Sequence, residues 1–252
     1  MAWQYLIYPF KVMGISQTYD GSYSHRKYST GNKKDYPIDE AGADTGRDYM
    51  YAPADVVVKK IYGRGDSGKP NTVWLQTRKK VITPIGIFYV TGRATHMSDA
   101  DIANLKVGDV FRVKEKMFRE GTDGGATGNH IHMTWGTGKF KGSGWSANSN
   151  GAYVLTTTGS NRKPEKLFFV DSGFTRIRDS RGLKFEKKPE PKTRYVHTPG
   201  SRLNVRKSYS VKSEVVGKLA DKLKVTVYAR RNGWSLIGVK KWVASRYLKK
   251  TR

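Results

Sequence analysis

The chain places two of its few histidines almost side by side. It has five histidines in 252 residues, and His130 and His132 stand one residue apart in the stretch GNHIHM. In a β-strand both imidazoles would point to one face, while Ile131 and Met133 would point to the other. Two solvated histidines on an edge strand would give the same pattern. The chemical alternative is that one imidazole binds zinc while the other acts on a nearby water or substrate oxygen.

Three residues elsewhere supply the other groups that such a site needs. His25 follows the turn-like segment GSYS, Asp39 lies in DYPIDEAGADTG, and His96 ends the segment FYVTGRATHM. A catalytic zinc site takes nitrogen and carboxylate ligands, and spare imidazoles can transfer protons. The chain has no cysteine, which excludes thiolate zinc sites and disulfides. His197 has no such partner in the sequence, and we interpret it as structural or solvated.

Short strands are expected to position these groups. The segments ADVVVKKIYG, NTVWLQTRK and IGIFYVTGRATHM are rich in β-branched and aromatic residues and are bounded by Gly, Pro or Asp. The one clear helical turn is SDADIANL, with Ser98 as its N-cap. Because the connections are short, the strands should pair antiparallel. The sequence therefore predicts an all-β-dominated fold built from antiparallel sheets.

A charged, proline-containing stretch divides the chain. KFEKKPEPKTR, residues 184–194, has no apolar periodicity and is typical of a linker. We expect a first domain over residues 1–180, a linker over 181–193 and a second domain over 194–252. The second domain is also predicted to be all-β, because it consists of short strand-like segments and contains an Asn-Gly hairpin signal. Its size suits a small barrel.

The composition predicts a polyanionic partner. The formal net charge is +26 and the pI is near 10.1. Nucleic acid is a common partner of such proteins, but a bacterial wall with its phosphate polymers and peptide carboxylates is polyanionic as well. The sequence has no pattern typical of folds that bind single-stranded nucleic acid, so we expect no nucleic acid partner.

Several stretches between residues 15 and 135 resemble the M23 (lysostaphin/LytM-like) family of zinc peptidases, which cut peptidoglycan peptides. In order, they are YAPADVVVKKI, ATHMSDADIANLKVGDVFRVKEKMFREGTDG and GNHIHM. The resemblance implies a Zn²⁺ cofactor held in part by His132 and Asp39. It also implies that His130 and His96 orient and deprotonate the attacking water and stabilise the oxyanion.

The chain departs from this family at the first zinc ligand. The family usually has a histidine four residues before the aspartate, and here that position holds Asp35. Either a longer loop makes His25 the ligand, or Asp35 has replaced the histidine. We favour His25, because it lies where the family's histidine enters and because two histidines with one carboxylate suit zinc better than the reverse. If neither binds, the domain is a degenerate peptidase.

Residues 194–252 resemble the bacterial SH3 (SH3b) modules of cell-wall enzymes. The matching pieces are LNVRKSYSVKSEVVGKL, KVTVYARRNGWSLI and KWVASRYL. The resemblance implies an SH3-like β-barrel that binds the wall. We expect Trp242 and Tyr247 to belong to its core, and Tyr209 and Trp234 to contact the wall.

Together the two resemblances indicate a monomeric, endolysin-like peptidoglycan hydrolase, a zinc endopeptidase carried to the wall by its second domain. The segment MAWQYLIYPFKVMGIS lacks the features of a signal peptide, and no apolar run is long enough to span a membrane. We therefore expect synthesis in the host cytoplasm, no membrane insertion and a phage or prophage origin. A tail-associated lysin and an exported autolysin are alternatives. The rival from another class is a non-enzymatic wall-binding protein whose peptidase domain has lost its zinc.

Overall fold

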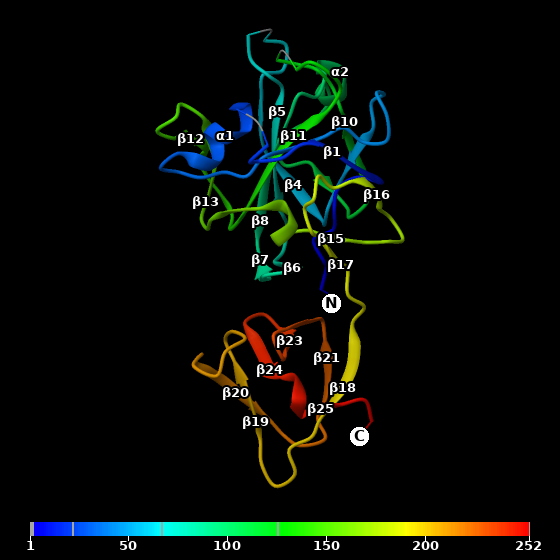
Figure 1. Ribbon diagram of the computed structural model, residues 1–252, viewed down its shortest axis with the longest axis vertical. Coiled ribbons are helices and arrows are strands. Elements are labelled where there is room, and N and C mark those ends of the chain that lie inside the picture. Colours follow the sequence, from blue (N-terminus) through cyan, green and yellow to red (C-terminus); the bar gives the residue numbers. More distant parts are fainter. Residues whose placement is uncertain (1–2, 22, 67, 125, 252) are drawn as a thin grey trace. The chain divides into compact units, whose positions relative to one another are not determined.

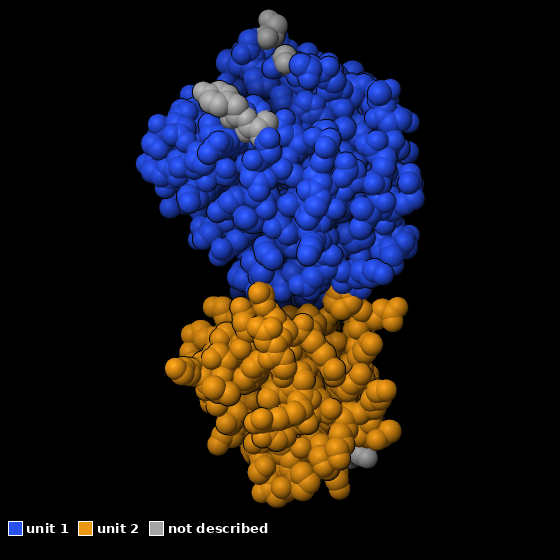
Figure 2. All heavy atoms as spheres, viewed as in Figure 1, with its two compact units in different colours: residues 1–188 blue, residues 189–252 orange. Residues whose placement is uncertain are grey.

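The computed structural model describes two compact units, residues 1–188 and 189–252 (Figure 2). Strands make up 44% of the structure and helices 7%, so the predicted all-β-dominated fold is confirmed. None of the described helices is long and apolar enough to span a bilayer. The described residues are 3–21, 23–66, 68–124 and 126–251.

A nine-stranded sheet forms the centre of the first unit (Figure 1). Its order is β16 (Arg176–Asp179), β1 (Val12–Gln17), β2 (Ile38–Glu40), β11 (Ile131–Thr137), β8 (Val90–Thr95), β5 (Thr72–Thr77), β4 (Val56–Tyr62) and β9 (Val110–Phe111), and β14 (Asn161–Arg162) also pairs with β11. These pairs are antiparallel except for β1 with β16.

Shorter elements surround this sheet. They are the pairs β3 (Tyr49–Tyr51) with β10 (Lys116–Arg119), β6 (Val81–Thr83) with β7 (Gly86–Phe88), β12 (Phe140–Ala147) with β13 (Tyr153–Thr157) and β15 (Phe169–Val170) with β17 (Glu186–Lys187), the helices α1 (Tyr23–Thr30) and α2 (Asp99–Ile102), and the 3-10 turn η1 (Pro164–Lys166). The Ser98 side chain accepts a hydrogen bond from the Asp101 amide, which confirms the predicted N-cap of α2.

The stretch GSYS, which we expected to be turn-like, overlaps helix α1, because the helix already begins at Tyr23. The helix has no apolar stripe that would have indicated it in the sequence. It is instead held from outside. Asn148 donates its side-chain amide to the Lys27 carbonyl (2.8 Å), and Asn150 donates to the Thr30 hydroxyl (3.0 Å). Tertiary contacts of this kind decide the conformation of short polar segments whose own helical propensity is weak.

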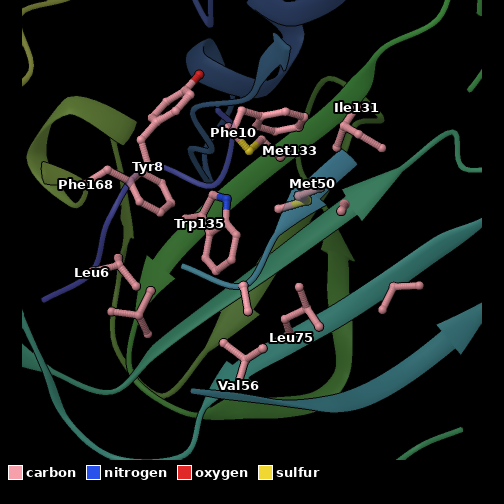
Figure 3. Close-up of a cluster of buried hydrophobic side chains, with 14 of the residues drawn as sticks. Leu6, Tyr8, Phe10, Met50, Val56, Leu75, Ile131, Met133, Trp135 and Phe168 are labelled. Atoms are coloured by element: carbon pink, nitrogen blue, oxygen red, sulfur yellow. The ribbon is translucent and has the colours of Figure 1, made fainter. Parts of the chain in front are cut away.

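The apolar face of β11 is buried in the core of the first unit (Figure 3). Ile131, Met133 and Trp135 alternate along the strand and are at most 2% exposed. Burial of one such side chain stabilises the fold by about 1.5–3 kcal/mol. Because a slip by one residue would move all three to the polar face of the sheet, the register of β11 is fixed, and His132 and Thr134 must point to that opposite face.

The second unit consists of two small antiparallel sheets around its own core. One sheet has the order β21 (Lys224–Val227), β18 (Lys192–Val196) and β25 (Leu248–Lys249), and the other has the order β20 (Val215–Leu219), β19 (Leu203–Arg206), β24 (Lys241–Ala244), β23 (Trp234–Gly238) and β22 (Ala229–Arg231), with the 3-10 turn η2 (Ser245–Tyr247) before β25. Asn232 and Gly233 both have positive φ (45° and 77°) in the turn between β22 and β23. The Asn-Gly hairpin is therefore confirmed.

The first part of the stretch expected to be a linker, residues 181–193, belongs to the first unit. Strand β17 pairs in parallel with β15, and the Lys188 amide donates to the Val170 carbonyl (2.8 Å). The Lys188 ammonium also pairs with Asp171. These are backbone and charge contacts, which leave no apolar periodicity in the sequence. The second part contributes Lys192 and Thr193 to β18.

Candidate metal centre

Three side chains from separate elements meet on the polar face of the sheet. Asp39 on β2 is the cross-strand neighbour of His132 on β11, so the two side chains share a face. His25, on α1, reaches them from outside the sheet. All three residues are buried. In the described part of the chain, they are the one group of three or more His, Cys, Asp or Glu residues whose ligand atoms are close enough to hold a metal ion.

The spacing of the three polar atoms fits a tetrahedral zinc ion. His25 Nε2 lies 3.2 Å from His132 Nδ1 and 3.2 Å from Asp39 Oδ1, and His132 Nδ1 lies 2.9 Å from Asp39 Oδ1. Zinc binds nitrogen and oxygen at about 2.0–2.1 Å, which places two ligands of one tetrahedron about 3.3 Å apart. Two imidazoles and one carboxylate are also a donor set of catalytic zinc sites, which leave the fourth position open.

The orientation of His25 favours a cation between its Nε2 atom and the Asp39 carboxylate. Its Nδ1 lies 3.1 Å from the Thr18 carbonyl, which can only accept a hydrogen bond. In the neutral ring Nδ1 therefore carries the proton, and Nε2 presents a lone pair to an Asp39 carboxylate oxygen 3.2 Å away. Two acceptors at that distance repel each other unless a metal ion or a second proton lies between them. The hydrogen bond to Thr18 is the kind that orients histidine ligands in metal sites.

The electrostatics of His132 and Asp39 also suit a cation. Burial lowers the pKa of His132 to about 4, although Asp39 acts to raise it. Burial acts to raise the pKa of the Asp39 carboxyl, but the adjacent imidazoles of His132 and His25 outweigh it and hold that pKa well below its usual range. At neutral pH the site therefore offers a neutral imidazole and an ionised carboxylate, the protonation states in which these groups bind metal.

His96 and His130 lie beside this group. His130 Nε2 is 3.7 Å from Asp39 Oδ1. The His96 ring lies 4.7 Å from the His130 ring and 6.0 Å from the His132 ring, measured between centroids. The structure thus brings together the five residues that the sequence predicted for the site, three in mutual contact and two at its edge.

Both edge histidines present Nε2 as an acceptor when neutral. His96 Nδ1 lies 2.6 Å from the Asp123 carbonyl, and His130 Nδ1 lies 2.8 Å from the Gly128 carbonyl. Because a carbonyl only accepts, Nδ1 is the protonated nitrogen in both rings. Burial lowers the pKa of His96, which keeps its imidazole neutral at neutral pH. Each ring can therefore take a proton at Nε2, as a general base requires.

A strained backbone holds His96 in place. Its φ is 87°, in a region that residues other than glycine rarely adopt. The His96 amide donates to the Asn71 carbonyl (3.0 Å), and the Asp123 amide donates to the His96 carbonyl (3.2 Å). Such strain costs about 1–3 kcal/mol and persists where the surroundings over-determine the conformation, often at functional sites. The glycine-rich loop that contains Asp123 thus fixes this imidazole.

Asp35, the alternative first ligand, lies outside the group. It is fully buried and accepts hydrogen bonds from the Thr134 hydroxyl, the Leu155 amide (2.8 Å) and the Tyr36 amide (3.0 Å). Its carboxylate therefore joins β11 to β13. This is a structural role, because both oxygens are already engaged.

Sequence reasoning missed two neighbours of the site. The Tyr28 ring lies 5.6 Å from the His132 ring and 6.4 Å from the His25 ring. Arg93, on β8, is 4% exposed and donates to the Tyr153 carbonyl (2.7 Å). Tyr28 stands three residues after His25, on the same face of α1, so recognition of the helix would have indicated it. Arg93 could have been singled out in the sequence, because it is a charged residue within the strand segment VTGRAT.

The two aromatic residues expected to contact the wall lie in different places on the second unit. Trp234 lines a cavity of about 260 Å³. Its other lining residues include Tyr247 and three arginines, Arg202, Arg206 and Arg246. Tyr209 is not among them. Its ring packs 5.3 Å from that of Trp242, and the Arg231 guanidinium lies 4.8 Å from it.

Comparisons with known proteins give only distant likenesses. No family model and no curated protein matches the chain. Among solved structures, lysostaphin from Staphylococcus simulans is 15% identical, with a TM-score of 0.38 over 94% of this chain and 92% of lysostaphin. The SpoIIQ–SpoIIIAH pore-forming complex gives 13% identity and a TM-score of 0.41 over 66% of this chain and 92% of that chain.

A zinc-containing peptidase from Vibrio cholerae is 14% identical, with a TM-score of 0.33 over 54% of this chain and 37% of that one. Likenesses this loose transfer no activity. The function is therefore inferred from the chain's own residues.

Replacement of His25 should remove the metal, whereas replacement of Asp35 should not. We expect His25→Ala to lose most of the bound zinc, because one of three ligands is gone. Asp35→Asn should retain about one zinc per chain but unfold more easily, by about 1–3 kcal/mol, because buried hydrogen bonds are mismatched. Zinc content after dialysis, with denaturant unfolding alongside, measures both effects. Zinc retained in His25→Ala and lost in Asp35→Asn would assign the ligand to Asp35 instead.

Proposed function

We propose that the protein is a peptidoglycan hydrolase, an endolysin-like zinc metalloendopeptidase that cleaves peptide bonds in cell-wall stem peptides or cross-bridges. The observation that carries this proposal is the convergence of His25, Asp39 and His132 at zinc spacing, with His96 and His130 beside them. A purely structural metal site closes its fourth position with a protein ligand. Here two imidazoles whose Nε2 atoms carry no proton in the neutral ring border the site instead.

The chain's own groups would divide the reaction as follows. Zinc held by His25, Asp39 and His132 would supply a Lewis acid and lower the pKa of an attacking water. The Nε2 atom of His130 or His96 would accept a proton from that water, and once protonated it could donate a hydrogen bond to the oxyanion. A proton held at Nε2 can then pass to the leaving amine. The fixed Nδ1–H hydrogen bonds keep both rings aimed at the site throughout.

Two features support the wall as the substrate. The net charge of +26 favours a polyanionic surface, and the M23-like stretches lie around the residues that converge. The rival proposal, a non-enzymatic wall-binding protein, requires a lost first ligand. The contact of His25 with Asp39 and His132 argues against that loss.

Removal of either edge histidine should separate turnover from metal binding. We expect His130→Ala and His96→Ala to keep about one zinc but to lose turnover on a soluble cross-bridge peptide by about 10²-fold or more, the scale of general acid–base catalysis. His197→Ala is the control, because that histidine is exposed in the second unit. Zinc content and peptide cleavage are measured on the same samples. Zinc that falls in step with activity would mean that these residues are ligands.

We propose further that the second unit is an SH3b-type wall-binding module. The cavity beside Trp234 supports this, because it combines two aromatic rings with three arginines and has no acidic residue in its lining. Such a set suits the carboxylate groups and apolar parts of wall peptides. Trp242 is 5% exposed, as expected for a core residue. Tyr247 packs against the core and also lines the cavity.

The second unit should bind purified walls by itself. Residues 189–252 are the segment to use, because a start at residue 194 would remove two residues of β18. Deletion of this unit should impair lysis of cells more than cleavage of a soluble peptide, since tethering raises the effective concentration at the wall. Binding should weaken with salt but persist, and Trp234→Ala and Tyr209→Ala should each reduce the remainder. Full release at moderate salt would reveal a polycationic anchor without a receptor.

A further inference from the structure

A second cavity, in the first unit, is lined mainly by cations. Its volume is about 540 Å³, and its lining includes Arg78, Lys79, Lys80, Arg112, Asp55 and Trp3. Four cations therefore face one carboxylate and one indole. A pocket of this size is in the range that holds organic ligands and is larger than a single inorganic ion needs.

This cavity lies far from the candidate metal centre. Across the sheet, His132 on β11 is paired with Thr95 on β8, and Thr95 is paired with Thr72 at the start of β5. Arg78 follows the other end of β5, six residues further along, which corresponds to about 20 Å of strand. A molecule bound at Arg78 is therefore outside the reach of the metal centre, and the cavity serves some other purpose than holding the reacting bond.

Backbone contacts fix the residues that line the cavity. The Arg78 amide donates to the Asp55 carbonyl (2.9 Å), which places Arg78 beside the start of β4. The Ile82 amide donates to the Gln4 carbonyl (2.9 Å), which holds the segment after Trp3 against β6. The cavity thus lies where the end of β5, the start of β4 and the N-terminal segment come together. Its lining is not a run of basic side chains on one loose loop.

The one carboxylate in the lining is already engaged. Asp55 accepts hydrogen bonds from the Val113 amide (3.0 Å) and from Arg112 (3.3 Å). Within the described residues, the side chains of Arg78 and Lys80 have no acidic partner. Both residues are exposed. The cavity therefore carries unneutralised positive charge that an anionic ligand would satisfy.

We propose that this cavity binds a phosphodiester-linked polyol polymer of the bacterial wall. The carboxylates of wall peptides are separate single charges, whereas four cations in one cavity match a chain with closely repeated charges. Guanidinium groups pair well with phosphate oxygens, and the Trp3 indole offers an apolar face to the polyol between them. The proposal rests on the proposed function, since it assumes an enzyme that works at the wall. The cavity would tether the hydrolase unit itself, independently of the second unit.

Charge reversal in the cavity tests this proposal in the full-length chain. The probe is poly(glycerol phosphate), and the variant is Arg78→Glu/Lys80→Glu. The matched control is Lys106→Glu/Lys166→Glu, which makes the same change in net charge at exposed lysines outside the cavity. We expect the cavity variant to weaken binding roughly tenfold or more and to flatten the slope of log K against log salt by up to about one per lost phosphate contact. The control should change both much less.

Three outcomes would overturn the proposal. They are equal weakening in the two double variants, equally tight binding of polyglutamate of matched charge, and tighter binding of single-stranded DNA than of the wall polymer. Trp3→Ala should reduce binding of poly(glycerol phosphate) but not of polyglutamate, which checks the polyol contact without a change of charge.

Peptide cleavage separates this proposal from the proposed function. The Arg78→Glu/Lys80→Glu variant should cleave a soluble cross-bridge peptide at the wild-type rate. If the wild-type protein cleaves no peptide, the hydrolase proposal fails while the binding result stands. If cleavage is normal and the two double variants bind alike, the cavity proposal alone fails.

Discussion

The alternation of side chains along β11 is the constraint on which the site depends. Ile131, Met133 and Trp135 are buried on one face, so His132 must point to the other. Pairing with β2 then places Asp39 directly beside His132, and pairing with β8 places His96 at the adjoining strand end. The position of His132 is thus fixed mostly by the apolar burial of the opposite face of β11.

The arrangement of polar atoms in the site is unfavourable in free energy unless a cation lies among them. His25 turns a lone pair toward the Asp39 carboxylate because Thr18 takes its other nitrogen. His132 is kept neutral by burial in spite of the adjacent negative charge. Buried acceptors that face one another are unfavourable without a metal or proton between them. Binding of zinc would therefore stabilise the folded chain as well as activate it.

The sequence carried enough information for the strand part of the site and too little for the rest. The alternation along residues 129–135 placed His132 opposite the apolar residues of β11. Because the chain has so few histidines, His25 and His96 were the natural candidates for its partners. Helix α1 was missed because it is polar throughout and is held by Asn148 and Asn150, more than a hundred residues away in the chain. The engagement of Asp35 with Thr134 and Leu155 is equally non-local.

The end of the first unit shows the same limit. Its last strand, β17, is held by pairing with β15 and by the Lys188–Asp171 ion pair, and neither leaves a hydrophobic pattern. The charged, proline-containing composition of residues 184–194 therefore led to the prediction of a linker. Patterns that repeat along one strand can be read from the sequence, whereas contacts between distant polar residues cannot.

Digestion of purified peptidoglycan tests the central claim most directly. Zinc-loaded protein is incubated with walls, and newly formed amino termini are identified by mass spectrometry, with a chelated sample and His25→Ala in parallel. The account predicts new amino termini at one type of peptide bond with the zinc-loaded protein and none in the other two samples. Walls left intact by a protein that binds zinc, or new amino termini that form equally well after chelation, would contradict it.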